Sequence, residues 1–142
     1  MAPRRVTLVP AWGMLPLRLV VGLVFVMHGG QKLFVMKLAG VTAFFTSLGI
    51  PLAGLAAPVV TAVEVLGGLA LILGAYTSWA ALLLAVNMTV AILVVKLSGG
   101  FFAPGGVEFE LTLLAAALSL AALGAGGYSW DAAREKPAAT VL

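Results

Sequence analysis

The chain has 142 residues, of which 63% are hydrophobic and 9% are charged, with a formal net charge of +3. Its mean hydropathy of +1.18 lies far above that of soluble domains, so we expect one small membrane domain. The absence of cysteine excludes thiol chemistry, disulfides, iron–sulfur ligation and a cysteine-based zinc site in this chain. There is also no basic stripe interleaved with aromatic residues, so nothing indicates binding to nucleic acid.

The N-terminal part predicts a short basic tail, residues 1–13, followed by a first membrane span at 14–34. The start resembles a signal peptide, but Arg18 interrupts the apolar run and no small-residue cleavage motif follows it, so we expect the span to be retained. One helical face of this span carries Arg18, Gly22, Phe25, Gly29 and Lys32. Glycines on such a face let another helix approach closely.

Residues 38–50 are apolar but too few to cross a bilayer, so we expect a short interfacial helix ended by Gly49 and Pro51. The following stretch, residues 65–95, contains no Asp, Glu, Lys or Arg. As one helix it would measure about 46 Å, against a hydrocarbon core of about 30 Å. A break at the polar cluster 74–78 therefore predicts two spans, at 54–73 and 79–97.

A fourth span is predicted at 108–127, after a loop at 98–106, and a polar tail at 131–142 ends the chain. Small and polar residues form one face of this span: Glu108, Thr112, Ala115, Ser119 and Ala122. The sequence thus predicts an all-α integral membrane four-helix bundle, residues 14–130, with a short interfacial helix between spans 1 and 2. Four spans place both termini on one side, and the distribution of basic residues favours the cytoplasm.

Glu64 lies near the middle of the second span, on a face with Ala57, Thr61 and Gly68. An unpaired charge there is costly, so Glu64 must be paired, protonated or beside water. We expect the side chain of Arg18 to reach inward to Glu64, and His28 to approach it from the other side. The pair either holds two helices together or forms a proton-carrying or ligand-binding site, and the sequence leaves both open.

The remaining polar residues have simpler interpretations. Lys32, Lys96, Glu108 and Glu110 gather near the outer helix ends, where a solvated rim of salt bridges is the simplest arrangement. Asn87, near the centre of the third span, is more typical of a link between helices than of chemistry. A single histidine cannot supply a bis-histidine haem, and the scattered carboxylates make no metal site.

The order and spacing of several motifs resemble those of the DoxX family, across about residues 15–131. The motifs are Leu17-Arg18-Leu19, Gly22, the HGGQKLF run at 28–34, Leu48-Gly49-Ile50-Pro51, Glu64, Gly67-Gly68, Leu71-Ile72-Leu73-Gly74, Gly105-Gly106-Val107-Glu108 and Gly124-x-Gly126-Gly127-Tyr128-Ser129-Trp130-Asp131. The resemblance implies a small four-helix membrane protein linked to membrane redox systems. Relatives are described as the membrane subunit of thiosulfate:quinone oxidoreductase or as partners in oxidative-stress complexes. The charged positions of the family fall on Arg18, Lys32, Glu64 and Glu108.

The function expected from these features is that of an integral subunit of a redox complex in the inner membrane. A quinone-accessible polar site is expected around Arg18, His28, Lys32 and Glu64, and the further candidate site residues are Asn87 and Glu108. No intrinsic cofactor is expected, so a quinone or a partner subunit would carry the electrons. Expected partners are the bilayer, other membrane or peripheral subunits, or a second copy. Two alternatives stay open: passage of a proton or small solute, and a purely structural assembly subunit.

Overall fold

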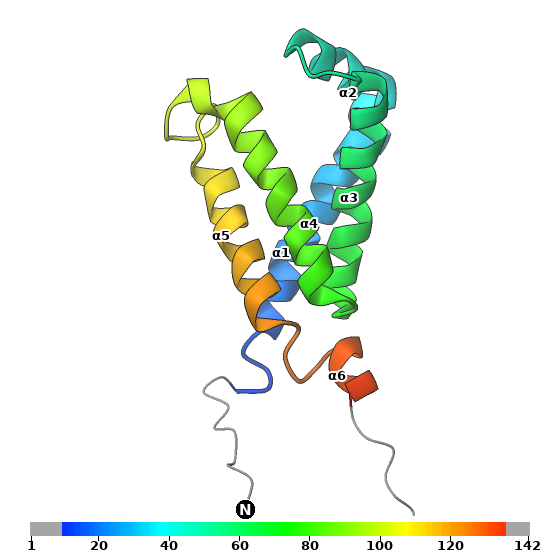
Figure 1. Ribbon diagram of the computed structural model, residues 1–142, viewed down its shortest axis with the longest axis vertical. Coiled ribbons are helices and arrows are strands. Elements are labelled where there is room, and N and C mark those ends of the chain that lie inside the picture. Colours follow the sequence, from blue (N-terminus) through cyan, green and yellow to red (C-terminus); the bar gives the residue numbers. More distant parts are fainter. Residues whose placement is uncertain (1–9, 136–142) are drawn as a thin grey trace, which may run out of the picture.

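The computed structural model describes residues 10–135, and all of its regular structure is helical (Figure 1). In chain order the elements are α1 (Leu15–Gly30), the π-helix η1 (Gln31–Met36), α2 (Lys37–Ser47), α3 (Ala53–Leu73), α4 (Thr77–Val90), the π-helix η2 (Ala91–Lys96), the 3-10 helix η3 (Leu97–Gly99), α5 (Glu108–Leu123) and α6 (Trp130–Glu135). The all-α fold class is therefore confirmed. Most of the two expected tails, residues 1–9 and 136–142, lies outside the described residues.

Four helices form the bundle, arranged as two pairs that α3 and α4 join (Figure 1). Helix α1 packs mainly on α3, and α4 mainly on α5, whereas α1 and α5 meet only over a short distance. Among residues 10–135, three continuous helical segments are long and apolar enough to cross a membrane: 15–47, 53–73 and 77–99. Helix α5 has 16 residues, about 24 Å of helix, and runs beside α4 as the fourth member. The chain is thus an all-α membrane protein.

The short helix predicted at 38–50 corresponds to α2, which packs on α3 at the end of the bundle far from α6 (Figure 1). It follows η1 with no intervening loop, because Lys37 adopts a φ of +58° and turns the chain at this point. Val41 and Phe45 of α2 are buried against Ala53 and Ala57 of α3. The apolar side of α2 is therefore directed onto the bundle.

The fourth span is shorter than predicted, and the region after it contains a short helix, α6, that the sequence did not predict. Helix α5 ends at Leu123, where the prediction continued to residue 127, because Gly124 and Gly126 adopt φ values of +75° and +76°. These left-handed conformations suit glycine and turn the chain out of the helix. Residues 124–129 then fold back across the end of the bundle to α6, where the sequence predicted only a polar tail.

The orientation of α5 also differs from the expected one. Its small-residue side, Thr112, Ala115, Ser119 and Ala122, is exposed. Leu113, Ala117 and Leu120 are buried instead. Leucines pack on the neighbouring helix α4, so the small residues of α5 do not mark its contact face.

Glycines fix the approach of α1 to α3, as the sequence predicted. A Cβ atom built on Gly22 would lie 2.7 Å from the backbone oxygen of Gly68. A Cβ on Gly29 would lie 2.5 Å from the side chain of Val65 and 3.2 Å from Cβ of Glu64. The two backbones therefore touch at these points, and this register places Gly29 directly beside Glu64.

We predict that Gly22→Val destabilises the bundle by about 1–3 kcal/mol or more, because the added methyl groups have no room against α3. Gly30→Ala is the matched control on the same helix, since a Cβ there meets no atom within 4 Å. Replacing a helical glycine by alanine at an open position should stabilise by about 0.5–1 kcal/mol. Thermal unfolding in detergent, followed by circular dichroism, gives the comparison. Equal melting temperatures for the two variants would contradict the assigned contact.

Candidate functional site: a polar cavity inside the bundle

Glu64 lies midway along α3 with only 3% of its surface exposed, and both of its carboxylate oxygens have partners. The Lys32 ammonium group donates to Oε2 and forms an ion pair with it. The Asn87 side-chain amide donates to Oε1 over 3.0 Å. Glu64 thereby links α3 to both η1 and α4, and the expectation that Asn87 connects helices is confirmed.

The position of Lys32 follows from the α1–α3 register. Gly29 lies against Glu64, and Lys32 follows it by three residues, close to one turn farther along the same side. The Lys32 side chain is 20% exposed, whereas that of Glu64 is 4% exposed. Lysine thus reaches inward from a more open position, and its charge offsets the cost of burying the carboxylate.

A cavity of about 110 Å³ lies beside this ion pair, between α1, α3, α4 and α5. Its polar lining comes from His28, Lys32, Glu64 and Glu110. Its apolar lining includes Phe25, Met88, Phe109 and Leu113. The cavity therefore combines hydrogen-bonding groups with the flat and flexible apolar side chains that suit a ring.

Glu110 is a second carboxylate of the cavity and belongs to a second pair. Its Oε1 lies 3.6 Å from Nζ of Lys96, which also donates to the backbone oxygen of Pro104 over 2.8 Å. Its Oε2 is buried and has no hydrogen-bond partner among residues 10–135. Both cations, Lys32 and Lys96, come from the π-helical segments η1 and η2, and π-helical turns are frequent at functional sites.

His28 and Phe109 form the outer wall of the cavity where α1 meets α5. Their ring centroids are 5.6 Å apart, and both residues are exposed. Because α1 and α5 have few other contacts, the cavity is separated from the lipid-facing surface mainly by these two rings. A ligand dissolved in the bilayer would reach the cavity along this side.

Arg18 does not contact Glu64, and this part of the prediction is wrong. Its guanidinium is buried and donates to the backbone oxygens of Ala125, over 2.9 Å, and Tyr128, over 2.6 Å. The α1–α3 register places Arg18 beside Gly74, where a Cβ would lie 2.3 Å from its Nη1. Gly74 lies ten residues beyond Glu64, about 15 Å along a helix. Arg18 therefore holds the 124–129 loop to the end of the bundle.

Glu108 also lies outside the cavity, although the sequence favoured it over Glu110. Its Oε1 accepts a hydrogen bond from the backbone N–H of Ala103 over 2.7 Å and so closes the loop before α5. Two residues along a helix correspond to about 200° of rotation, so Glu108 and Glu110 point to different sides. The Lys96–Glu110 contact fits the expected rim of salt bridges, whereas Lys32 belongs to the buried site.

An apolar layer separates the cavity from the Arg18 end of the bundle. Phe25, Leu71, Leu84 and Leu120, one from each of the four helices, are at most 1% exposed and belong to one packed cluster. Within the described part of the chain, this layer interrupts the polar side chains between Glu64 and Arg18. The cavity is therefore a site reached from one half of the bundle and not a pore through it.

Comparison with known proteins bears on the same region. The DoxX family model matches residues 13–97, a range that includes Arg18, His28, Lys32, Glu64 and Asn87 but not α5. A curated relative, the protein named "Putative oxidoreductase CatD" from Bacillus subtilis (strain 168), is 36% identical over 112 residues. The alignment covers 79% of this chain and 79% of that protein. No solved structure gives a significant match.

Proposed function

The chain belongs to the DoxX family, and on that premise we propose that it is the membrane subunit of a redox-linked complex. The polar cavity beside Lys32 and Glu64 is the proposed site for a lipid-soluble quinone. The observation that carries this proposal is a buried carboxylate with both oxygens hydrogen-bonded, next to a cavity whose lining includes the exposed rings of His28 on α1 and Phe109 on α5. The name of the Bacillus subtilis relative, "Putative oxidoreductase CatD", agrees with this class of function.

The chemistry of the lining supports a quinone headgroup. Carbonyl oxygens need hydrogen-bond donors, and Lys32 and His28 supply N–H groups on one side of the cavity. Phe25, Phe109 and Leu113 offer apolar surface for a ring. At about 110 Å³ the cavity is well below the roughly 300–1,000 Å³ of sites for drug-sized ligands. It is also smaller than the engineered cavity of about 150 Å³ that holds benzene, so entry of a quinone ring, with its apolar tail in the bilayer, requires the exposed side chains of His28 and Phe109 to move apart.

The composition of the chain supports a role as a subunit. With no cysteine and a single histidine, the chain offers few ligands for an electron-carrying metal centre of its own. In a redox role, electrons would pass through the bound quinone or through a partner subunit. Further membrane or peripheral subunits, or a second copy of the chain, are accordingly proposed as partners.

Of the two alternatives, passage of a proton or small solute is not favoured. The apolar layer around Phe25 and Leu84 interrupts the polar path between the two ends of the bundle. A purely structural role for the Lys32–Glu64 pair is the alternative that an experiment must separate from quinone binding.

To distinguish quinone binding from a purely structural role, the wild type is compared with the double variant Lys32→Met, Glu64→Gln. The quantity compared is the affinity for a ubiquinone that carries a single isoprenoid unit. Removing both charges of a buried pair is often neutral for stability, whereas Lys32→Met alone leaves a buried carboxylate without its partner and should cost a few kcal/mol. We predict that the double variant folds but binds the quinone at least about tenfold more weakly, about 1.4 kcal/mol. Equilibrium titration in detergent measures both affinities.

Glu108→Gln is the matched control, because it removes a carboxylate on α5 outside the cavity. Its affinity for the quinone should equal that of the wild-type protein. A folded double variant that binds the quinone as tightly as the wild type would show that the pair is structural and would overturn the proposed site.

We also propose that the protein lies in the inner (cell) membrane with both termini in the cytoplasm. The first and last described residues lie at the same end of the bundle, where Gly127 donates its N–H to the oxygen of Ala11 (Figure 1). In the sequence, the basic residues Arg4 and Arg5 precede the first described residue, and such residues favour the cytoplasmic side. We predict that a cysteine replacing exposed Ser98, at the opposite end, reacts with a membrane-impermeant maleimide in intact cells. Labelling only after the membrane is permeabilised would reverse the orientation.

A further inference from the structure

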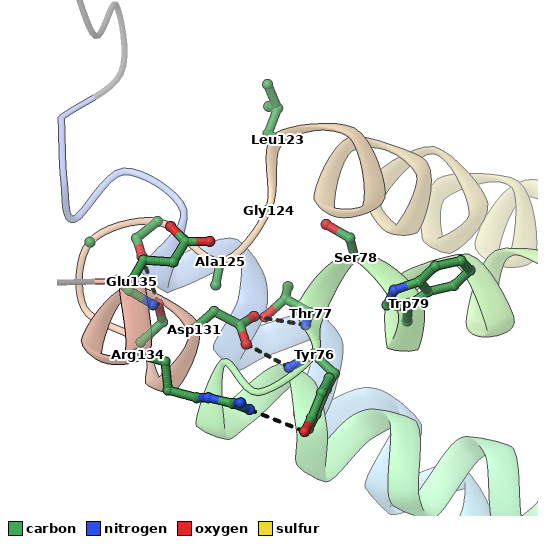
Figure 2. A pocket seen from close by; sticks show the side chains of 14 residues that line it. Tyr76, Thr77, Ser78, Trp79, Leu123, Gly124, Ala125, Asp131, Arg134 and Glu135 are labelled. Carbon is green, nitrogen blue, oxygen red and sulfur yellow. Dashed lines mark hydrogen bonds between the residues drawn. The ribbon is translucent and has the colours of Figure 1, made fainter. Parts of the chain in front are cut away.

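A second and larger pocket, of about 700 Å³, lies at the other end of the bundle, where α4 begins, α5 ends and α6 crosses (Figure 2). It is separated from the Lys32–Glu64 cavity by the apolar layer described above. Its volume lies within the roughly 300–1,000 Å³ typical of ligand sites. The proposed quinone site leaves this pocket unexplained.

Helix α6 is held firmly against the bundle by Asp131. The carboxylate accepts hydrogen bonds from the backbone N–H groups of Tyr76, over 2.7 Å, and Thr77, over 2.9 Å, and so caps the start of α4 (Figure 2). The Asp131 N–H donates to the oxygen of Gly74 over 2.9 Å. Burial raises the pKa of Asp131, but these hydrogen bonds and the charge of Arg134 outweigh burial and hold the pKa below its ordinary value. Asp131 is thus a charged anchor that fixes the pocket wall.

The pocket lies at the depth expected for lipid headgroups. The exposed aromatic residues at this end of the bundle are Trp12, Tyr76, Trp79, Tyr128 and Trp130. Tryptophan and tyrosine concentrate where hydrocarbon meets headgroups, because their rings combine apolar and hydrogen-bonding parts. This end of the helices therefore lies at the membrane–water interface.

The lining changes from apolar to charged across the pocket. Trp79 and Leu123, both exposed, lie on the side of the helices α4 and α5 (Figure 2). Ser78 lies between them and the charged side, which carries Arg134 and Glu135 of α6. A ligand that fits this gradient has an apolar part on the bilayer side and a charged part on the aqueous side.

The charged side of the pocket presents both signs. The Arg134 Nη1 donates to the phenolic oxygen of Tyr76 over 3.1 Å, and the guanidinium lies 5.7 Å from the centre of that ring. Guanidinium has five N–H donors, so this contact leaves most of them for a phosphate group. Glu135 adds a carboxylate that suits a primary amine, while Asp131 and Glu135 together disfavour a headgroup with only negative charge.

From this arrangement we infer that the pocket binds one bilayer phospholipid with a zwitterionic, amine-bearing headgroup. Arg134 contacts the phosphate, Glu135 accepts a hydrogen bond from the amine, and the glycerol and upper acyl chains lie along Trp79 and Leu123. A primary ammonium has N–H groups to donate to the Glu135 carboxylate and a quaternary ammonium has none, so a primary amine is preferred.

The test is competition between phosphatidylethanolamine and phosphatidylglycerol for protein purified in detergent. The protein is incubated with an equal mixture of the two lipids, and retained lipid is measured by native mass spectrometry. The wild type should retain one phosphatidylethanolamine per chain, with at least a fivefold preference. Arg134→Gln should lose most of the retained lipid, and Glu135→Gln should reduce or reverse the preference.

Lys37→Gln is the matched control, because it removes one exposed positive charge at the opposite end of the bundle and should change neither quantity. Because Arg134→Gln also removes the contact with Tyr76, its melting temperature is measured in parallel, and Glu135→Gln tests headgroup choice without that contact. Equal retention of both lipids by the wild type, or an unchanged preference in Glu135→Gln, would overturn the inference. Retention of a peripheral protein at this pocket in place of lipid would overturn it as well.

Discussion

A carboxylate in the middle of an apolar bundle is the constraint on which the rest of this structure depends. Glu64 cannot lie unpaired at this depth, because an isolated charge in hydrocarbon costs several kcal/mol. Lys32 and Asn87 satisfy its two oxygens from two different helices. A polar cavity lies beside these groups, so the residues that stabilise Glu64 also line a space that can hold a polar ligand.

The glycine contacts between α1 and α3 decide which cation meets this carboxylate. Gly22 against Gly68 and Gly29 against Glu64 set a register that leaves little freedom to slide. Under that register Lys32 reaches the carboxylate, while Arg18 lies beside Gly74 and is surrounded by the oxygens of the 124–129 loop. The two ends of α1 therefore have separate roles: one end closes the bundle, and the other supplies the polar site.

Much of this could be predicted from the sequence, because charges are rare and glycines recur at helical spacing. The face of α1 from Arg18 to Lys32, the burial of Glu64 and the linking role of Asn87 all follow from spacing and charge. The partner of Arg18 could not be predicted, because it is a pair of backbone oxygens that only the fold of the 124–129 loop brings together. The choice of Glu110 over Glu108 depends on the rotation of α5, and both its leucine-rich and its small-residue sides were plausible contact faces.

The central claim, a charged Glu64 paired with Lys32 inside the membrane, is tested most directly by infrared difference spectroscopy of the protein in lipid. The spectrum of Glu64→Gln, subtracted from that of the wild type at neutral pH, should show the loss of a carboxylate band. Lys32→Met removes the cation that donates to Oε2 of Glu64, so the frequency of the remaining Glu64 band should differ from that of the wild type. Loss of a protonated carboxyl band in the first comparison would contradict the account.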